Sequence, residues 1–228
     1  MARIGRRCWV VLLLAGLVLS PGMFSPERIV RAAACRTFQE TGKAVCDPFL
    51  AYWDSHGGLA QQGLPLTDEF IEVSPIDGKP YTVQYFERAR FEKHPENAAP
   101  YDVLLGLLGS EQLKAKYQNV PPAIPGDPFN NPALPQGCFT FTQTGYQVCG
   151  PFLEYWQTHG GLAQQGLPLT GVFLETNPTN GLTYPTQYFE RARFEYHYEF
   201  AGTENAVLLG LLGREQFLVK YPNGAPKP

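Results

Sequence analysis

Residues 84–92 read Gln84-Tyr85-Phe86-Glu87-Arg88-Ala89-Arg90-Phe91-Glu92, and the same nine residues recur at 187–195. They lie inside a longer duplication, in which residues 35–97 align with 138–200 at an offset of 103 and 40 of 63 positions are identical. After one inserted residue, the duplication continues from Val103–Gly109 to Val207–Gly213. Two near-equal copies favour two equivalent binding or structural units over a single asymmetric active site.

The duplication organises the chain. Residues 35–117 form repeat module 1 and residues 138–221 form repeat module 2. Between them, residues 118–137 contain six prolines in twenty positions, which predicts a semi-extended linker. Residues 222–228 are a short tail rich in proline and glycine. We therefore expect two domains that move relative to each other.

Residues 1–34 are typical of a secretory signal peptide. Three arginines precede an apolar run at 9–18, and Ala32-Ala33-Ala34 supplies small residues for cleavage. The apolar run is too short for a comfortable membrane span. We expect a secreted or cell-surface protein with no membrane span after the signal is removed. The alternative is that residues 1–34 are retained as an N-terminal anchor, because a long, charged stretch separates the apolar run from the cleavage site.

Cysteine spacing supports export. Once Cys8 leaves with the signal, each module keeps two cysteines eleven residues apart. The simplest of the three pairings is Cys35–Cys46 with Cys138–Cys149, and each bridge contributes roughly 3 kcal/mol on the chain-entropy estimate. A lipid attached to Cys35 is the weaker alternative, because its counterpart Cys138 is internal. No metal site is predicted, since no second pair of Cys or His stands nearby at ligand spacing.

The charge balance narrows the choice of partners. Residues 35–228 carry 13 Lys and Arg against 20 Asp and Glu, a net charge of −7, and contain no basic run. This composition argues against nucleic acid and anionic membrane surfaces as partners. The sequence also has no serine nucleophile motif, phosphate-binding loop or metal signature, so no cofactor is predicted.

The pattern of each module predicts an α+β fold. Residues 37–45 resemble a hairpin, and Asp47-Pro48 is expected to open a helix that ends at Gly57-Gly58. Strands are expected at 69–73, 81–86 and 89–94, and a closing helix at 111–117. Pro185 predicts that the corresponding strand of module 2 begins there or runs along an edge. We expect two tandem copies of a small module with a short helix packed on antiparallel β-hairpins.

Several of these residues resemble the LGFP repeat. The resemblance rests on Gly57-Gly58-Leu59, on Gly63–Glu69, on Asp77-Gly78 and on Gln84-Tyr85-Phe86, and the second copy shows most of the same set. The shared 84–92 run also resembles exported proteins of filamentous green bacteria. The resemblance implies attachment to cell-wall polysaccharide or a role in organising the envelope. The cysteine pair is not part of that family pattern.

One candidate ligand surface lies in the duplicated run. Aromatic rings stack on sugars, and neighbouring Arg and Glu can bond hydroxyl groups, so Tyr85, Arg90 and Glu92 are candidates. Their counterparts in module 2 are Tyr188, Arg193 and Glu195. The structural alternative is that Arg90 and Glu92 form cross-strand ion pairs, and that most of the repeated aromatics fill a small core.

The histidines offer a second candidate. His56 and His159 each follow a predicted helix and could approach His94 and His197 if the last hairpin packs beside the Gly-Gly loop. The simpler interpretation is a histidine at a helix C-terminus that bonds a main-chain carbonyl.

Three functions follow. The leading hypothesis is a non-enzymatic secreted or cell-surface protein that binds envelope or extracellular polysaccharide through two equivalent modules. The alternative is a structural spacer or a protein–protein interaction module. The third is a carbohydrate-active hydrolase that uses Glu87 or Glu190, but an adjacent arginine lowers the pKa of such a carboxylate and spoils it as a general acid.

Overall fold

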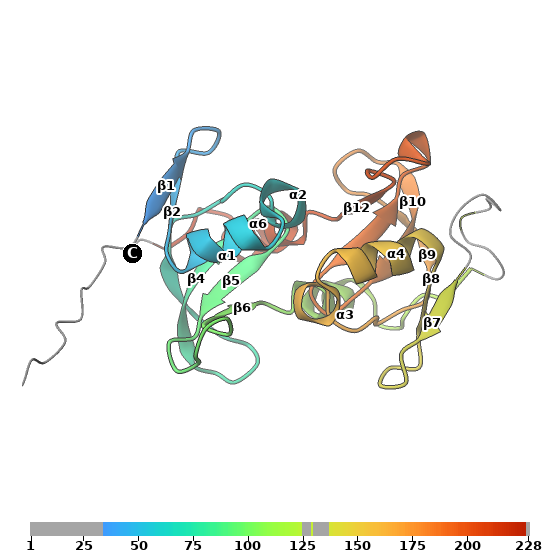
Figure 1. Ribbon diagram of the computed structural model, residues 1–228, viewed down its shortest axis with the longest axis horizontal. Coiled ribbons are helices and arrows are strands. Elements are labelled where there is room, and N and C mark those ends of the chain that lie inside the picture. The colour runs from blue at the N-terminus through green and yellow to red at the C-terminus, as the bar shows by residue number, and fades with distance from the viewer. Residues whose placement is uncertain (1–33, 125–128, 130–136, 227–228) are drawn as a thin grey trace, which may run out of the picture. The chain divides into compact units, whose positions relative to one another are not determined.

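The computed structural model describes residues 34–124, 129 and 137–226 (Figure 1). In repeat 1, the hairpin β1 (Cys35–Phe38) and β2 (Lys43–Cys46) precedes the helices α1 (Phe49–Ser55) and α2 (Gly58–Gln62). A four-stranded antiparallel sheet follows, made of β3 (Phe70–Val73), β4 (Pro80–Tyr85), β5 (Arg90–Lys93) and β6 (Val103–Leu105), and the repeat closes with α3 (Leu108–Lys116).

Repeat 2 has the same order of elements. Its hairpin is β7 (Cys138–Thr140) and β8 (Gln147–Cys149), followed by α4 (Gly150–Thr158) and α5 (Gly161–Gln164). Its sheet contains β9 (Phe173–Thr176), β10 (Thr183–Tyr188), β11 (Arg193–Tyr196) and β12 (Val207–Leu209), with a 3-10 turn at Tyr198–Phe200 and a last helix α6 (Leu212–Lys220). The predicted α+β class with two similar modules is confirmed. No helix in the described ranges is long and apolar enough to cross a membrane.

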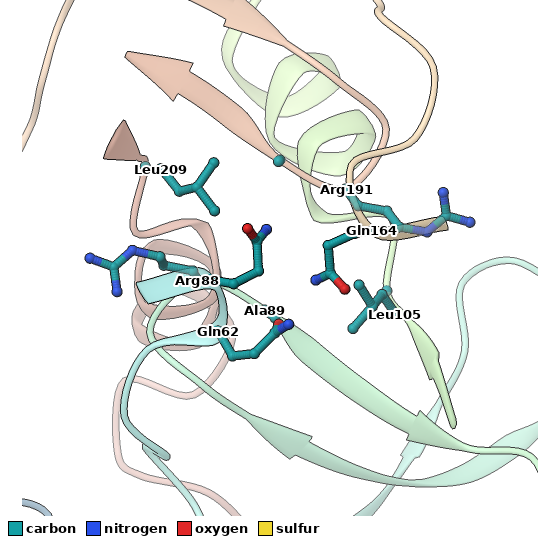
Figure 2. Close-up of a pocket in the computed structure, with 11 residues that line it drawn as sticks. Gln62, Arg88, Ala89, Leu105, Gln164, Arg191 and Leu209 are labelled. Atoms are coloured by element: carbon teal, nitrogen blue, oxygen red, sulfur yellow. The ribbon is translucent and has the colours of Figure 1, made fainter. Parts of the chain in front are cut away.

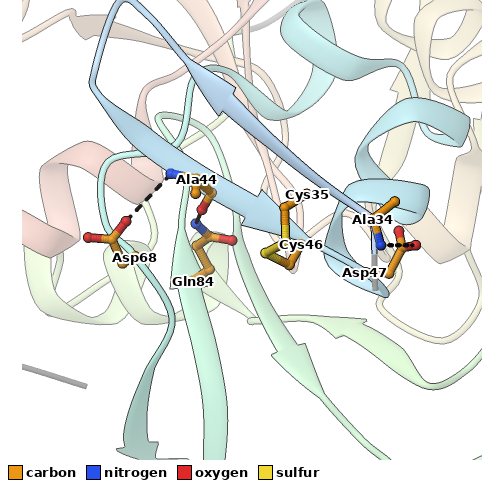
Figure 3. Close-up of a disulfide and its surroundings, with 7 residues drawn as sticks. All are labelled: Ala34, Cys35, Ala44, Cys46, Asp47, Asp68 and Gln84. Carbon is orange, nitrogen blue, oxygen red and sulfur yellow. Dashed lines mark hydrogen bonds between the residues drawn. A yellow bond between two sulfur atoms is a disulfide. The ribbon is translucent and has the colours of Figure 1, made fainter. Parts of the chain in front are cut away.

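The predicted disulfides are confirmed in both repeats. Each bridge joins residues that face each other across a hairpin, as Cys35 and Cys46 do between β1 and β2. In Figure 3, the amide of Gln84 in β4 reaches the carbonyl of Ala44 at 2.8 Å and ties this hairpin to the main sheet. Asp47 accepts a bond from the amide of Ala34, so it does not cap α1.

Strand alternation gives each sheet two buried faces. On one face, Phe91 and Leu105 pack with Phe49 and Leu50 of α1, which lies across the strands in Figure 1. The opposite face carries Phe70, Val83 and Tyr85, which form a separate cluster. This second face is also buried, so another element must cover it. That element is not α1, because no residue of α1 belongs to the second cluster.

The second layer comes from the other repeat. Phe217 and Tyr221, in and just after α6, pack against Phe70, Val83 and Tyr85 of repeat 1. In the same way, Leu113 and Tyr117 of repeat 1 pack against Phe173 and Tyr188 of repeat 2. The described residues belong to one compact unit. The repeats therefore share their cores, in contrast to the expectation of two domains that move relative to each other.

Two local predictions need correction. Pro185 does not begin a strand or lie in an edge strand, because β10 starts at Thr183 and pairs on both sides. The proline is tolerated because pairing with β11 begins one residue later, at Thr186. A short helix also begins at the second glycine of each Gly-Gly pair, where a loop was expected. The proposed signal segment and most of the linker lie outside the described residues.

Candidate functional site

The six residues predicted to form a ligand surface lie inside the protein. They share relative exposures of 4% or less: Tyr85, Arg90, Glu92, Tyr188, Arg193 and Glu195. Their side chains do come together within each repeat, as the sequence suggested. They do not form an open ligand surface, and the structural alternative describes them better, because the face of the sheet that carries them is covered by the terminal helix of the other repeat.

In repeat 1 these side chains form a buried charge cluster around Glu72, which we call charge cluster 1. Arg90 bonds Glu72 at 3.1 Å and also contacts Glu92, and the Tyr85 hydroxyl donates to Glu72 at 2.9 Å. The cluster is completed from the other repeat. Lys220 Nζ lies 2.8 Å from Glu72 and the Tyr221 hydroxyl donates to the same carboxylate at 2.6 Å.

Repeat 2 builds the equivalent charge cluster 2 around Glu175. The Tyr188 hydroxyl donates to Glu175 at 3.1 Å, and Arg193 pairs with Glu195 at 2.7 Å. Repeat 1 supplies the remaining partners, since Lys116 lies 2.6 Å from Glu175 and the Tyr117 hydroxyl also donates to it. Each cluster is therefore incomplete without the helix of the opposite repeat.

The electrostatics favour the ionised form of Glu72 and of Glu195. Burial alone would raise the pKa of Glu72, but hydrogen bonds from Lys220 and Tyr221 and the charge of Arg90 hold it below its ordinary value. In Glu195, burial is likewise outweighed by His197, Arg193 and Asn177, and the pKa is lowered. A general acid needs the opposite shift. The clusters are thus suited to holding the fold together.

The two glutamates suggested for hydrolysis have local structural partners. Glu87 Oε2 accepts the main-chain amide of Leu64 at 3.1 Å, and Glu190 Oε2 accepts that of Leu167 at 3.0 Å. Each fixes the turn that follows the short helix of its repeat. Within the described part of the chain, no group of three or more metal-ligating side chains is placed to hold an ion.

The predicted role of His56 and His159 as C-terminal helix residues is confirmed. Nδ1 of His56 lies 3.0 Å from the carbonyl oxygen of Tyr52, and His159 makes the same contact with Tyr155. Each imidazole also stacks on the tyrosine, with ring centroids 3.9 and 3.8 Å apart. The alternative pairing with His94 and His197 does not form, because those two bond Glu96 and Glu199.

The histidine geometry fixes the tautomer. A carbonyl oxygen can only accept, so Nδ1 must carry the proton, and Nε2 of the neutral ring must be an acceptor. Within the described ranges, neither Nε2 atom has a hydrogen-bonding partner. Each ring therefore presents one free acceptor at a defined position.

These histidines line a groove to which both repeats contribute, here called the inter-repeat groove. Its volume is about 220 Å³, and it is lined by corresponding residues from each repeat: Ser55, His56, Gly57, Gln61, Thr158, His159, Gly160 and Gln164. Apart from the two histidines, the polar side chains of this lining are hydroxyl and amide groups, which carry no charge. The groove was not predicted, although Gly57, Gln61, Gly160 and Gln164 belong to a Gly-Gly-Leu-Ala-Gln-Gln run that is identical in both copies.

Hydrogen bonds across the repeats hold the floor of the groove. The Tyr52 hydroxyl donates to Gln164 at 3.3 Å, and the Tyr155 hydroxyl donates to Gln61 at 3.3 Å. Gln61 in turn donates to Gln165 at 3.2 Å. Burial raises the pKa of Tyr52 and of Tyr155 to about 12, although Arg191 and Arg88 partly oppose it. The tyrosines therefore remain protonated donors at neutral pH.

A larger hollow of about 420 Å³ adjoins the groove and shares Thr158 and His159 with it. It is lined by α4 and residues 202–207, and it contains the carboxylates of Glu154 and Glu204. Repeat 1 has Ala51 and Pro100 at the corresponding positions. The combined depression therefore has a neutral part built from both repeats and an acidic part that belongs to repeat 2.

A third space lies beneath the groove and is too small for a ligand. Figure 2 shows it between Gln62 and Arg88 of repeat 1 and Gln164 and Arg191 of repeat 2, with the two guanidinium groups directed away from each other. Its volume is about 10 Å³, which is room for one water at most. Arg88 and Arg191 instead donate to the carbonyls of Leu59 and Leu162.

Comparison with protein-family models, curated proteins and solved structures found no match.

Proposed function

We propose that this chain is a non-enzymatic extracellular protein that binds polysaccharide in the inter-repeat groove and the adjoining hollow. The observation that carries the proposal is the lining of the groove, which combines hydroxyl, amide and imidazole groups from both repeats. Such neutral donors and acceptors match the hydroxyl groups of a glycan. The two free Nε2 acceptors are fixed by stacking on Tyr52 and Tyr155, so they need no ordering when a ligand binds.

The shape of the site supports a chain-like ligand. The groove and the hollow share Thr158 and His159, so an extended molecule can occupy both. The carboxylates of Glu154 and Glu204 favour a ligand that carries an amino group at one end. The two disulfides are compatible with an extracellular location, because such bridges persist in oxidising compartments.

This proposal changes the expected stoichiometry. Two equivalent modules predicted two binding sites, but the groove takes four of its lining residues from each repeat. We propose one composite site per chain. The resemblance to LGFP repeats, which implies attachment to cell-wall polysaccharide, points in the same direction.

The test is retention on insoluble cell-wall polysaccharide and on soluble glycans of defined charge. We expect the double variant His56→Ala/His159→Ala to lose at least tenfold in affinity at a temperature where unfolding curves show that it is fully folded, because its unfolding midpoint should also fall as the contacts to Tyr52 and Tyr155 are lost. The matched control is Gln39→Ala/Gln143→Ala, which removes two exposed polar side chains from the hairpins. The proposal is wrong if the histidine variant and the control are retained equally.

A structural role is the second candidate. The repeated aromatics of both copies are buried or half-buried, so none offers an open stacking surface: Tyr52, Trp53, Tyr81, Tyr85, Phe86, Phe91, Tyr155, Trp156, Tyr184, Tyr188, Phe189 and Phe194. Failure of the wild-type chain to bind any glycan would favour a spacer or protein–protein interaction module.

A further inference from the structure

The strongest unexplained feature is how closely α3 and α6 approach the opposite repeat. A Cβ atom added to Gly109 in α3 would lie 1.9 Å from the carbonyl oxygen of Phe189. A Cβ atom added to Gly213 in α6 would lie 2.0 Å from that of Phe86. Neither glycine has a positive φ, so glycine is needed at these positions for close contact.

Main-chain hydrogen bonds reinforce both contacts. The amide of Ser110 donates to the carbonyl of Glu190 at 3.1 Å, and the amide of Arg214 donates to that of Glu87 at 3.0 Å. Amides in the first turn of a helix have no partner within the helix. Each repeat therefore caps the helix of the other with its own tight turn.

The two helices also bond each other. Gln112 donates to Glu215 at 2.9 Å, and Gln216 donates to Glu111. Glu111 and Glu215 occupy equivalent positions, and so do Gln112 and Gln216. Lys116 and Tyr117 at the end of α3, and Lys220 and Tyr221 at the end of α6, add further contacts to the opposite repeat. Each repeat therefore presents the same set of contacting residues to the other. Such a self-complementary surface is the kind found at two-fold interfaces between separate chains.

We propose that this surface, the exchange interface, also accepts a second copy of this chain, giving a closed dimer in which repeat 1 of each chain packs on repeat 2 of the other. The exchange interface comprises the first turns of α3 and α6, the turns 86–89 and 189–192, and the two charge clusters. Its contacts are the same whether the opposite repeat belongs to the same chain or to another.

Only the linker favours pairing within one chain. A short flexible linker gives an effective concentration in the millimolar range, so separate chains exchange repeats when their local concentration approaches that value. Ile124 and Phe129 of the linker pack against the core of repeat 2, and the amide of Ile124 donates to the carbonyl of Val172 at 2.7 Å, so exchange requires this part of the linker to detach. Once detached, twenty residues rich in proline reach on the order of 60 Å, which allows repeat 1 to leave repeat 2 of its own chain. The dimer keeps both grooves, because each groove needs one repeat 1 and one repeat 2.

Two complementary full-length variants provide the test. Gly109→Ala blocks the docking of α3, and Gly213→Ala blocks the docking of α6, while alanine is a better helix former than glycine. In either variant alone, every pairing of repeat 1 with repeat 2 has one blocked contact. In a mixture, repeat 1 of the Gly213→Ala chain and repeat 2 of the Gly109→Ala chain form a pair with neither contact blocked. The remaining two repeats have both contacts blocked and stay apart, so the mixed species is an open dimer held by one intact pair.

The two variants are unfolded together with disulfides intact, refolded at high concentration, and measured by size-exclusion chromatography with light scattering. We expect a species of twice the chain mass in the mixture and several-fold less of it in either variant alone. The control mixes wild type with the double variant Gly109→Ala/Gly213→Ala, which has the same two substitutions but gains no intact pair between chains. A mixture with no more dimer than its components overturns the proposal.

A second measurement removes the dependence on variants that fold. Wild-type chains labelled with a donor or an acceptor fluorophore are refolded together over a range of concentrations. We expect energy transfer to rise as the concentration approaches the millimolar range. Its absence throughout that range also overturns the proposal, and neither result depends on glycan binding.

Discussion

Lys220→Met tests whether the opposite repeat completes charge cluster 1. The lysine stands 2.8 Å from Glu72, whose side chain is 4% exposed, whereas the lysine side chain is 39% exposed. A hydrogen bond to a charged group contributes about 1.5–3 kcal/mol, and the exposure of Lys220 places the expected loss near the lower end, at about 2 kcal/mol. Methionine keeps the length and apolar stem of the side chain, so packing changes little.

The dependence of that loss on pH makes the test specific. The pKa of Glu72 is lowered in the folded protein, so the stabilisation is present above the unfolded pKa of about 4.5 and is lost as the pH falls through the folded value. Removing Lys220 takes away part of the cause of this shift. The difference between wild type and variant should therefore be largest near neutral pH and shrink in acid.

The assay is urea unfolding of the oxidised protein at several pH values. Lys116→Met is the matched variant in charge cluster 2 and should lose a similar amount, because Lys116 contacts Glu175 at 2.6 Å. Lys114→Met, at an exposed position of α3, is the control and should change stability by less than about 0.5 kcal/mol. A loss that is equal at pH 7 and in acid, or no larger than that of the control, would refute this account of the cluster.

Two further predictions concern other parts of the fold. Burial lowers the pKa of His197, but the nearby carboxylate of Glu195 and the bond to Glu199 raise it above 6.5. The stabilisation from this histidine is therefore complete below about pH 6.5 and is lost as the pH rises through the folded value. His197→Gln should remove that pH dependence in unfolding curves, and an unchanged dependence would contradict the prediction. Trp53 is half-buried and donates to the carbonyl of Gly63 at 2.9 Å, so Trp53→Ala should lower the free energy of unfolding by about 3 kcal/mol. Trp156→Ala is its counterpart in repeat 2, and Tyr101→Ala is the exposed control. A loss of less than about 1 kcal/mol would show that the contact is unimportant.

Local features of the fold were predictable because their signals are local. The eleven-residue cysteine spacing predicted both disulfides, and the Asp77-Gly78 turn correctly separated β3 from β4. The closing helix was expected at 111–117 and is found at Leu108–Lys116.

The position of that helix was not predictable by the same means. The sequence of α3 shows that it has residues to bury, but nothing in its pattern says which repeat it covers. The helix could pack on the sheet of its own repeat or on the sheet of the other repeat. Because the two sheets have nearly the same sequence, both arrangements give the same pattern and cannot be told apart. For the same reason the sequence left open whether Tyr85, Arg90 and Glu92 face solvent, and the structure shows that they are buried.

The shared cores explain why residues 84–92 are unchanged at 187–195. Arg90 bonds residues of its own sheet and lies within 3.7 Å of Glu111, whereas Glu87 and Ala89 form the turn on which α6 docks. A substitution in this run alters a sheet in one repeat and a docking surface for the other at the same time. The groove adds a second constraint on residues such as His56, Gly57 and Gln61, because each repeat contributes four of its lining residues. Identity between the copies therefore marks the surfaces where the repeats meet.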